Sequence, residues 1–264
     1  VHNEGEQTML DYLYKWYLWG WSFGDLTKKI PTICMPDDHD VYQGNIWGMA
    51  GEKSSPGERW TDGGYTESPE FVNMVQRTQT SHMPDPYDPT PVQQGIEVYY
   101  TSMDYGGVSF AILEDRKFKS SPYEDERNAQ LLGERQLKFI NDWTSDWHEN
   151  IFFKSVISQT VFGGVNTHYG KIQKDKDTNG WPPEGRNRAL KAIRRGFAFM
   201  IGGDQHLGTI VHHGIDNFGD AGYSFVVPSV GCVWPRFWNP NVEGADHIRG
   251  ETSYTGNYID GFVK

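Results

Sequence analysis

The chain of 264 residues has few cysteines, no long apolar run and a deficit of basic residues. Cys34 and Cys232 are its two cysteines, and each lies in or beside an apolar run. We therefore expect buried free thiols and not a disulfide framework. Two cysteines do not indicate whether the protein works in a reducing or an oxidising cellular compartment. The most apolar stretch, 12–23, is interrupted by a lysine, a glycine and a serine. Because a membrane span needs ~20 apolar residues, the sequence predicts none.

Acidic residues outnumber basic residues by 35 to 24, which gives a formal net charge of −11. This imbalance argues against binding to nucleic acid, which requires clustered lysine and arginine. A small phosphate-ester substrate is still allowed, because bound cations can reverse the local field of a site. The 37% hydrophobic and 14% aromatic content, with ten tryptophans, indicates a packed globular protein.

Segments with helical and strand patterns alternate along the chain. Helices are predicted over residues 9–21, 69–76, 124–147 and 184–195. Strands are predicted over residues 33–35, 96–101, 108–113, 151–157, 197–201, 209–213 and 223–230. This alternation predicts a layered α/β fold in which helices cover a mixed sheet. Ligands of such folds bind at the carboxyl ends of the strands.

Two short polar motifs each follow an apolar run that we interpret as a buried strand. The first motif, Asp37-Asp38-His39-Asp40, follows Ile33-Cys34-Met35, and the second, Asp204-Gln205-His206, follows the predicted strand 197–201. Each motif presents carboxylate and imidazole together, which are ligands for divalent or trivalent metal ions. Either motif alone is equally well explained as a polar turn. Their joint occurrence after two strands predicts a metal-dependent hydrolase.

The order and spacing of these motifs resemble a known family. Residues 36–41 look like the Asp-Asp-His-Glu/Asp-Val block of PhoD-like alkaline phosphatases, and residues 203–206 resemble their Gly-Asp-x-His block. Between the two blocks, residues 105–116 resemble the family's strand pair ending in Leu-Asp-x-Arg. Residues 132–137 and 155–159 resemble its next helix and strand. The similarity extends from about residue 9 to residue 230.

The resemblance implies a calcineurin-like metallophosphoesterase sandwich of mixed β-sheets flanked by helices. It implies hydrolysis of phosphomonoesters or phosphodiesters by hydroxide bound at a binuclear site of iron and calcium, or of other divalent cations. Asp38, Asp204 and His206 become metal ligands, His39 the acid that protonates the leaving group, and Asp40 the partner that orients His39. Many family members are exported, so a periplasmic or extracellular location is implied as well.

One departure from the family pattern concerns the start of the chain. The family's upstream Gly-Asp-x-x-Tyr block, which holds the bridging carboxylate, has no counterpart in residues 1–32. We therefore expect residues 1–264 to form one partial metallophosphoesterase domain, truncated at both ends and possessing only part of the metal site. Such a fragment can be inactive by itself.

Several alternatives stay open at this point. Arg116 is a candidate for binding substrate phosphate through its planar guanidinium, although an arginine at a strand end more often forms a surface ion pair. The aromatic residues of 12–21 are expected to be buried, with an exposed carbohydrate-binding platform as the alternative. His212 and His213 are adjacent on a predicted strand, so one should face the core. A non-catalytic metal- or carbohydrate-binding module is the second candidate function, and a glycosidase with two catalytic carboxylates is the third.

Overall fold

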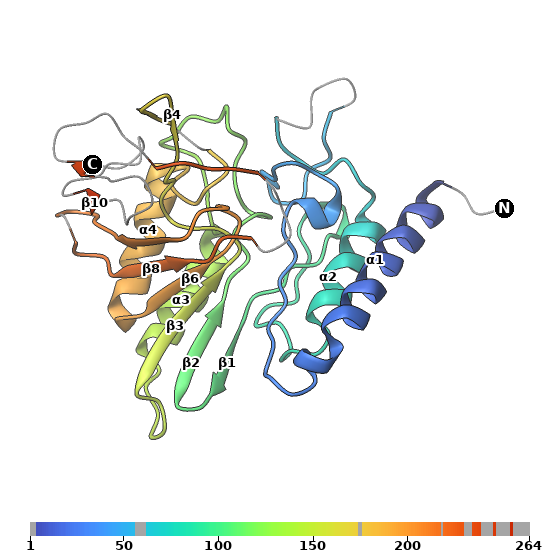
Figure 1. Cartoon of the computed structure of the whole chain (residues 1–264), viewed down its shortest axis with the longest axis horizontal. Coiled ribbons are helices and arrows are strands. Elements are labelled where there is room, and N and C mark those ends of the chain that lie inside the picture. Colours follow the sequence, from blue (N-terminus) through green and yellow to red (C-terminus); the bar gives the residue numbers. More distant parts are fainter. Residues whose placement is uncertain are drawn as a thin grey trace.

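The computed structural model describes residues 4–55, 62–173, 176–217, 219–229, 234–238, 245–246 and 254–255. Its central feature is a six-stranded mixed sheet flanked by helices (Figure 1). In spatial order the strands are β1 (Thr101–Tyr105), β2 (Val108–Ile112), β3 (Phe153–Ser158), β6 (Phe199–Gly202), β8 (Tyr223–Val226) and β7 (Thr209–His212). Two small sheets pair β4 (Thr167–His168) with β5 (Lys171–Ile172) and β9 (Ala245–Asp246) with β10 (Tyr254–Thr255). The predicted mixed α/β fold is confirmed.

The four inner strands of the sheet run parallel, and the two edge strands run antiparallel to their neighbours. Val156 of β3 pairs with Ala111 of β2 and with Met200 of β6, and all three side chains are buried. Such burial is typical of parallel strands. The carboxyl ends of β2, β3 and β6 therefore meet at one edge of the sheet.

The predicted hairpin is confirmed, although its first strand begins at Thr101 and not at residue 96. Gly106 and Gly107 connect β1 to β2 with φ values of 62° and 83°. A two-residue turn with positive φ at both positions matches the twist of the flanking strands. Residues 96–100 precede the hairpin and belong to no strand of the sheet.

Helices α3 (Gly133–Ser145) and α4 (Pro183–Ile193) cover one face of the sheet (Figure 1). Phe139, Trp143 and Leu190 from these helices pack with sheet residues in the main core. The helix predicted over 124–147 is shorter than expected, because residues 124–132 form turns whose apolar side chains reach the core without helical geometry. The short 3-10 helices are η1 (His39–Val41), η2 (Gln93–Gly95) and η3 (Arg194–Gly196).

Helices α1 (Glu4–Thr27) and α2 (Pro69–Thr80) form a second layer beyond the β1 edge of the sheet (Figure 1). Ser68 caps α2, as predicted, by accepting a hydrogen bond from Phe71 N at 3.3 Å. Tyr12 of α1 packs edge-on against Phe71 in a second core that also includes Val41, Tyr65 and Ile96. Among the described helices, none is both long and apolar enough to cross a membrane.

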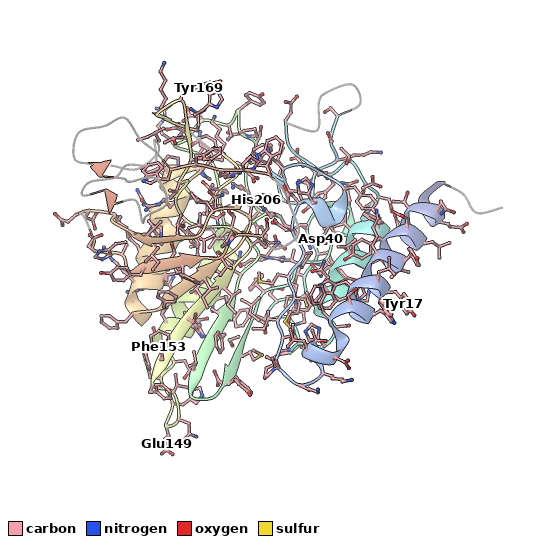
Figure 2. The ribbon with its side chains drawn as sticks, viewed as in Figure 1. Tyr17, Asp40, Glu149, Phe153, Tyr169 and His206 are labelled. Carbon is pink, nitrogen blue, oxygen red and sulfur yellow. The ribbon has the colours of Figure 1, made fainter. Side chains whose placement is uncertain are left out.

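The expectation that the α1 aromatics are buried is only partly correct. Tyr12 is buried and two tryptophans are half-buried, whereas Tyr14, Tyr17 and Trp21 are 61%, 64% and 77% exposed. Figure 2 shows Tyr17 pointing away from the body of the molecule. The reason is geometric: α1 contacts α2 along one side, while aromatic residues occur on almost all of its sides.

The strand predicted over residues 33–35 is wrong. These residues are half-buried in an irregular segment, and in the described part of the chain no strand pairs with them. An apolar run becomes a strand only where a neighbouring backbone offers hydrogen bonds. The strand before the second motif is confirmed as β6, although Phe197 lies outside it and is 86% exposed.

His213 is the histidine that faces the core, and its burial gives a pH prediction. Its Nε2 lies 2.8 Å from Ser224 Oγ, and burial, with Arg186 nearby, lowers the pKa of the imidazole well below its usual value. The unfolded chain binds a proton below about pH 6.5 and the folded chain does not, so stability falls as the pH falls. We expect a loss of up to ~1.4 kcal/mol per pH unit, which His213→Gln should reduce. Urea unfolding of both proteins between pH 7 and pH 5 measures the difference, and equal slopes would contradict it.

Candidate active site

Three carboxylates from the two motifs meet at the carboxyl edge of the sheet. Asp37, Asp38 and Asp204 each offer a ligand oxygen, and these oxygens lie within 4.8 Å of one another. Two of the residues come from the first motif and one from the second, although the motifs lie far apart in the sequence. The tertiary structure therefore brings together the two motifs that the sequence analysis selected.

The end of β3 holds the two motifs in place. Gln159 donates a hydrogen bond from Nε2 to the carbonyl of Pro36, and its own carbonyl accepts Gly203 N–H at 3.0 Å. The Oε1 atom of Gln159 accepts Asp115 N–H at 3.0 Å. One glutamine therefore links the first motif, the turn after β6 and the segment after β2.

The second motif is a turn with unusual backbone geometry. Asp204 and His206 have φ values of 65° and 54°, in the left-handed region that aspartate and histidine tolerate better than most residues. Gln205, between them, is buried. The Nδ1 atom of His206 is buried and, within the described residues, has no hydrogen-bond partner. His206 is not one of the three clustered residues, but its ring nitrogen is available to a ligand that the structure does not contain.

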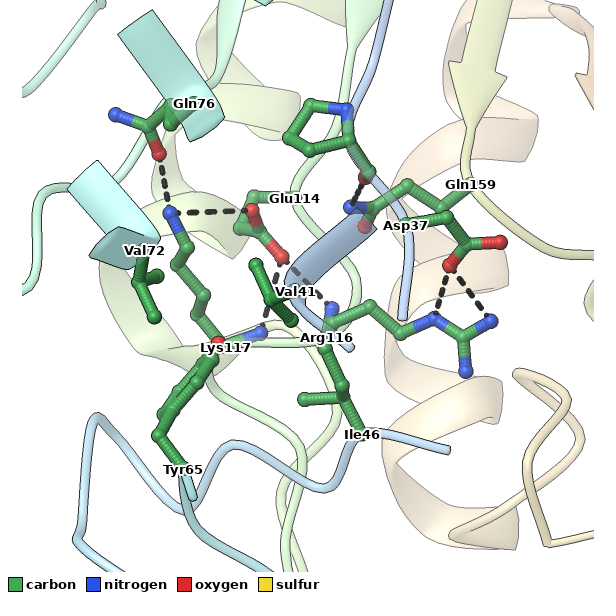
Figure 3. Close-up of a pocket in the computed structure, with 11 residues that line it drawn as sticks. Asp37, Val41, Ile46, Tyr65, Val72, Gln76, Glu114, Arg116, Lys117 and Gln159 are labelled. Carbon is green, nitrogen blue, oxygen red and sulfur yellow. Dashed lines mark hydrogen bonds and ion pairs between the residues drawn. The ribbon is translucent and has the colours of Figure 1, made fainter. Parts of the chain in front are cut away.

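Arg116 is the central cation of this site, and the surface ion pair considered from the sequence is wrong for it. The side chain is 1% exposed. Its Nε and Nη2 contact Asp37 Oδ1 at 2.9 and 2.8 Å (Figure 3). Its Nη2 is also 3.3 Å from Asp204 Oδ2, and its Nη1 pairs with Asp177. The guanidinium therefore joins both motifs to a third segment of the chain.

Asp177 and Asp115 are two further buried carboxylates of the site that were not expected from the sequence. Asp177 is buried and pairs with Arg116. Asp115 is fully buried, accepts Thr160 N–H at 3.1 Å and also accepts a hydrogen bond from Asn179. The position of Asp115 directly before Arg116 was a signal that could have indicated its role. Asp177 lies in a loop, and its sequence position offered no such signal.

Burial and mutual repulsion disturb the ionisation of the clustered carboxylates. Burial is the main cause that raises the pKa of Asp37 to about 7 and that of Asp38 to about 8. Burial is also the largest single influence on Asp204, but the positive charges of Arg116, Arg236 and Lys119, together with a hydrogen bond from Thr160, outweigh it and lower the pKa of Asp204. Three oxygen ligands that repel one another are suited to a hard cation, which would keep all three ionised. The residues present therefore fit a metal ion.

His39 and Asp40 belong to the first motif but are not members of the carboxylate cluster. Asp38 accepts His39 N–H at 2.8 Å and begins η1, while the imidazole of His39 is exposed. Asp40 is half-buried, accepts Asp37 N–H at 2.8 Å and is hydrogen-bonded to Gln79. The pairing of Asp40 with the His39 imidazole stays a prediction. Figure 2 shows where Asp40 and His206 lie in the molecule.

Two cavities adjoin the first motif. The cavity in Figure 3 has a volume of about 20 Å³, and its lining combines apolar side chains with charged and amide groups that include Asp37, Glu114 and Arg116. That volume is close to the space of a single water molecule. The second cavity has a volume of about 460 Å³, lies beside α1 and is lined by His39 and Asp40. Only the second of these has the size of a small-molecule site.

The fold and the site together define a mixed α/β protein with a carboxylate cluster, suited to a metal ion, at the carboxyl ends of parallel strands. The model of the PhoD-like phosphatase family matches residues 6–241. The chain therefore belongs to the PhoD-like phosphatase family, which confirms the resemblance seen in the motifs.

A solved structure described as "Structure of PhoD" shares this fold, with a TM-score of 0.52 and 20% sequence identity. The match covers 73% of this chain and 38% of that one, so the chain spans less than half the length of the structure it resembles. No curated protein sequence matches the chain.

Proposed function

We propose that this chain contributes the carboxylate and imidazole ligands of a metal-dependent phosphoric ester hydrolase. The observation that supports the proposal is the convergence of Asp37, Asp38 and Asp204 from two motifs within 4.8 Å. Asp38, Asp204 and His206 are the proposed metal ligands. The buried Nδ1 of His206, which has no hydrogen-bond partner among the residues that the structure describes, is consistent with that role. Membership of a phosphatase family makes a small phosphate ester the expected substrate.

Other residues of the site have separate proposed roles in the reaction. Two bound cations, iron and calcium or other divalent ions, would polarise the phosphate and lower the pKa of a water molecule. Arg116 holds the carboxylates of Asp37 and Asp204 in position, and a contact from Arg116 to the phosphate stays a prediction. His39, whose imidazole is exposed, is the residue proposed to donate a proton to the leaving oxygen, and Asp40 is the residue proposed to orient it.

Metal binding by the chain itself is the direct test. After treatment with a chelator, the protein should bind calcium or manganese by calorimetry, with a rise in unfolding temperature. At a free ion concentration of one hundred times Kd, the expected gain in stability is about 2.7 kcal/mol. The same samples are assayed with p-nitrophenyl phosphate and bis(p-nitrophenyl) phosphate, which separate monoesterase from diesterase activity.

The outcomes distinguish the three candidate functions. Metal-dependent hydrolysis supports the proposal. Binding of metal or glycan without turnover, also in a longer form of the protein that includes the upstream region, favours the non-catalytic module. Hydrolysis of a glycoside that a chelator does not affect favours a glycosidase. A chain that binds neither calcium, manganese nor iron would falsify the assignment of the ligands.

A further inference from the structure

The 460 Å³ cavity beside α1 has features that the proposed metal site does not use. Trp16 and Trp19 of α1 form part of its wall, and His39, Asp40 and Gln79 form another part. Its volume lies within the range of small-molecule sites, about 300–1,000 Å³. The cavity therefore combines an aromatic surface with polar groups from the first motif.

The aromatic part of the wall is ordered by stacking. The rings of Trp16 and Trp19 lie 4.7 Å apart with an interplanar angle of 13°, and Phe23 lies 5.8 Å beyond Trp19. Both indoles are half-buried, so each keeps some surface accessible. Because the indoles turn one face toward each other, the surface that they offer to a ligand consists of their accessible edges and outer faces, to which a planar ring can bind edge-on or offset.

The polar part of the wall links the cavity to the reaction. His39 directly follows the clustered Asp38, and Asp40 is held by the N–H of the clustered Asp37 at 2.8 Å. A general acid must lie within hydrogen-bond reach of the oxygen that it protonates. A substrate whose leaving oxygen meets His39 therefore places the rest of its leaving group in the cavity that His39 lines.

We propose that this cavity is the leaving-group site of the enzyme and that it selects phosphate esters whose alcohol carries a planar ring. The inference rests on the proposed function, because it assigns the proton donated by His39 to the leaving oxygen. The small cavity near Arg116 has no room for such a group at about 20 Å³. Ring recognition by Trp16 and Trp19 is therefore separate from phosphate recognition at the carboxylate cluster.

The test compares the binding of two non-hydrolysable probes of equal charge, phenylphosphonate and methylphosphonate. Both are measured in the presence of calcium. Calorimetry and quenching of tryptophan fluorescence should show about tenfold tighter binding of phenylphosphonate, the size of one aromatic stacking contact. Trp19→Leu should remove this preference. Trp16 also packs against the α1–α2 core, so it is changed to phenylalanine, which keeps an aromatic ring. Trp16→Phe should keep most of the preference for phenylphosphonate.

Trp21→Leu is the matched control, because Trp21 lies on the same helix, is 77% exposed and does not line the cavity. Phenol, observed by saturation-transfer NMR, reports the ring site even if the metal site is not functional. Phenol binding that Trp19→Leu abolishes, without metal binding by the chain and without ester hydrolysis by a longer form of the protein, supports the ring site and contradicts the proposed function. Hydrolysis with equal affinity for both phosphonates, unchanged in Trp19→Leu, overturns the inference and leaves the proposed function standing.

Discussion

Asp204→Asn is expected to weaken metal binding by at least about a hundredfold and to reduce metal-dependent hydrolysis by a similar factor. Loss of a residue that only supports a metal ligand costs about 10- to 100-fold, and loss of a ligand should cost no less. Asparagine tolerates the left-handed φ of 65° at this position, so the turn can persist while the charge is removed. Calorimetric titration with calcium or manganese, together with the ester assay, measures the change.

Asp216→Asn provides the matched control for this substitution. Asp216 is exposed and pairs with Lys191 and Arg194 at the surface, at 3.8 and 3.3 Å. Loss of such surface pairs typically changes stability by less than about 1 kcal/mol and should leave metal affinity unchanged. If Asp204→Asn and Asp216→Asn bind metal equally well, Asp204 is not a ligand and the proposed site is wrong.

Arg116→Leu is expected to destabilise the metal-free protein by about 3–5 kcal/mol. Removal of one partner from a buried ion pair leaves the other charge uncompensated, and here three aspartates lose the same partner. Arg116→Lys should be intermediate, because a single ammonium group cannot contact three carboxylates as the planar guanidinium does. Urea unfolding in the presence of a chelator measures both changes.

Two further measurements make the Arg116 prediction specific. Calcium should restore part of the lost stability, since a cation bound at the carboxylate cluster would supply positive charge in place of the missing guanidinium. Arg127→Leu is the control, because the ion pair that Arg127 forms among the described residues is with Asp125 at the surface. The side chain of Arg127 is 85% exposed, so its loss should change stability by less than about 1 kcal/mol. A change below about 1 kcal/mol for Arg116→Leu would show that the buried pairs do not hold the site together.

Local signals explain the elements that were predicted correctly. Ser68 before a proline and a glutamate marks the start of α2, and the glycine pair between two apolar runs marks the hairpin. These patterns depend on backbone dihedrals and caps within a few residues. For the same reason β6 and α4 were found close to their observed limits.

Signals that depend on distant partners were misread. The run 33–35 has strand composition but lacks a neighbouring strand in the described chain, so it stays irregular. Arg116 follows a strand in the way surface arginines do, yet Asp37 and Asp177 lie 79 and 61 residues away in sequence and bury it. A sequence pattern contains no information on which charges will meet across such distances.

The sequence by itself determined the family, the mixed α/β class and the two motifs, because these depend on residue identity, order and local periodicity. Only the tertiary structure decided that Asp37 joins Asp38 and Asp204, that Arg116 is the buried cation among them, and that His39 faces a cavity walled by Trp16 and Trp19. The physical reason is that these contacts arise where the ends of parallel strands converge and where α1 meets the first motif. Both placements are set by burial of the core and not by any local pattern.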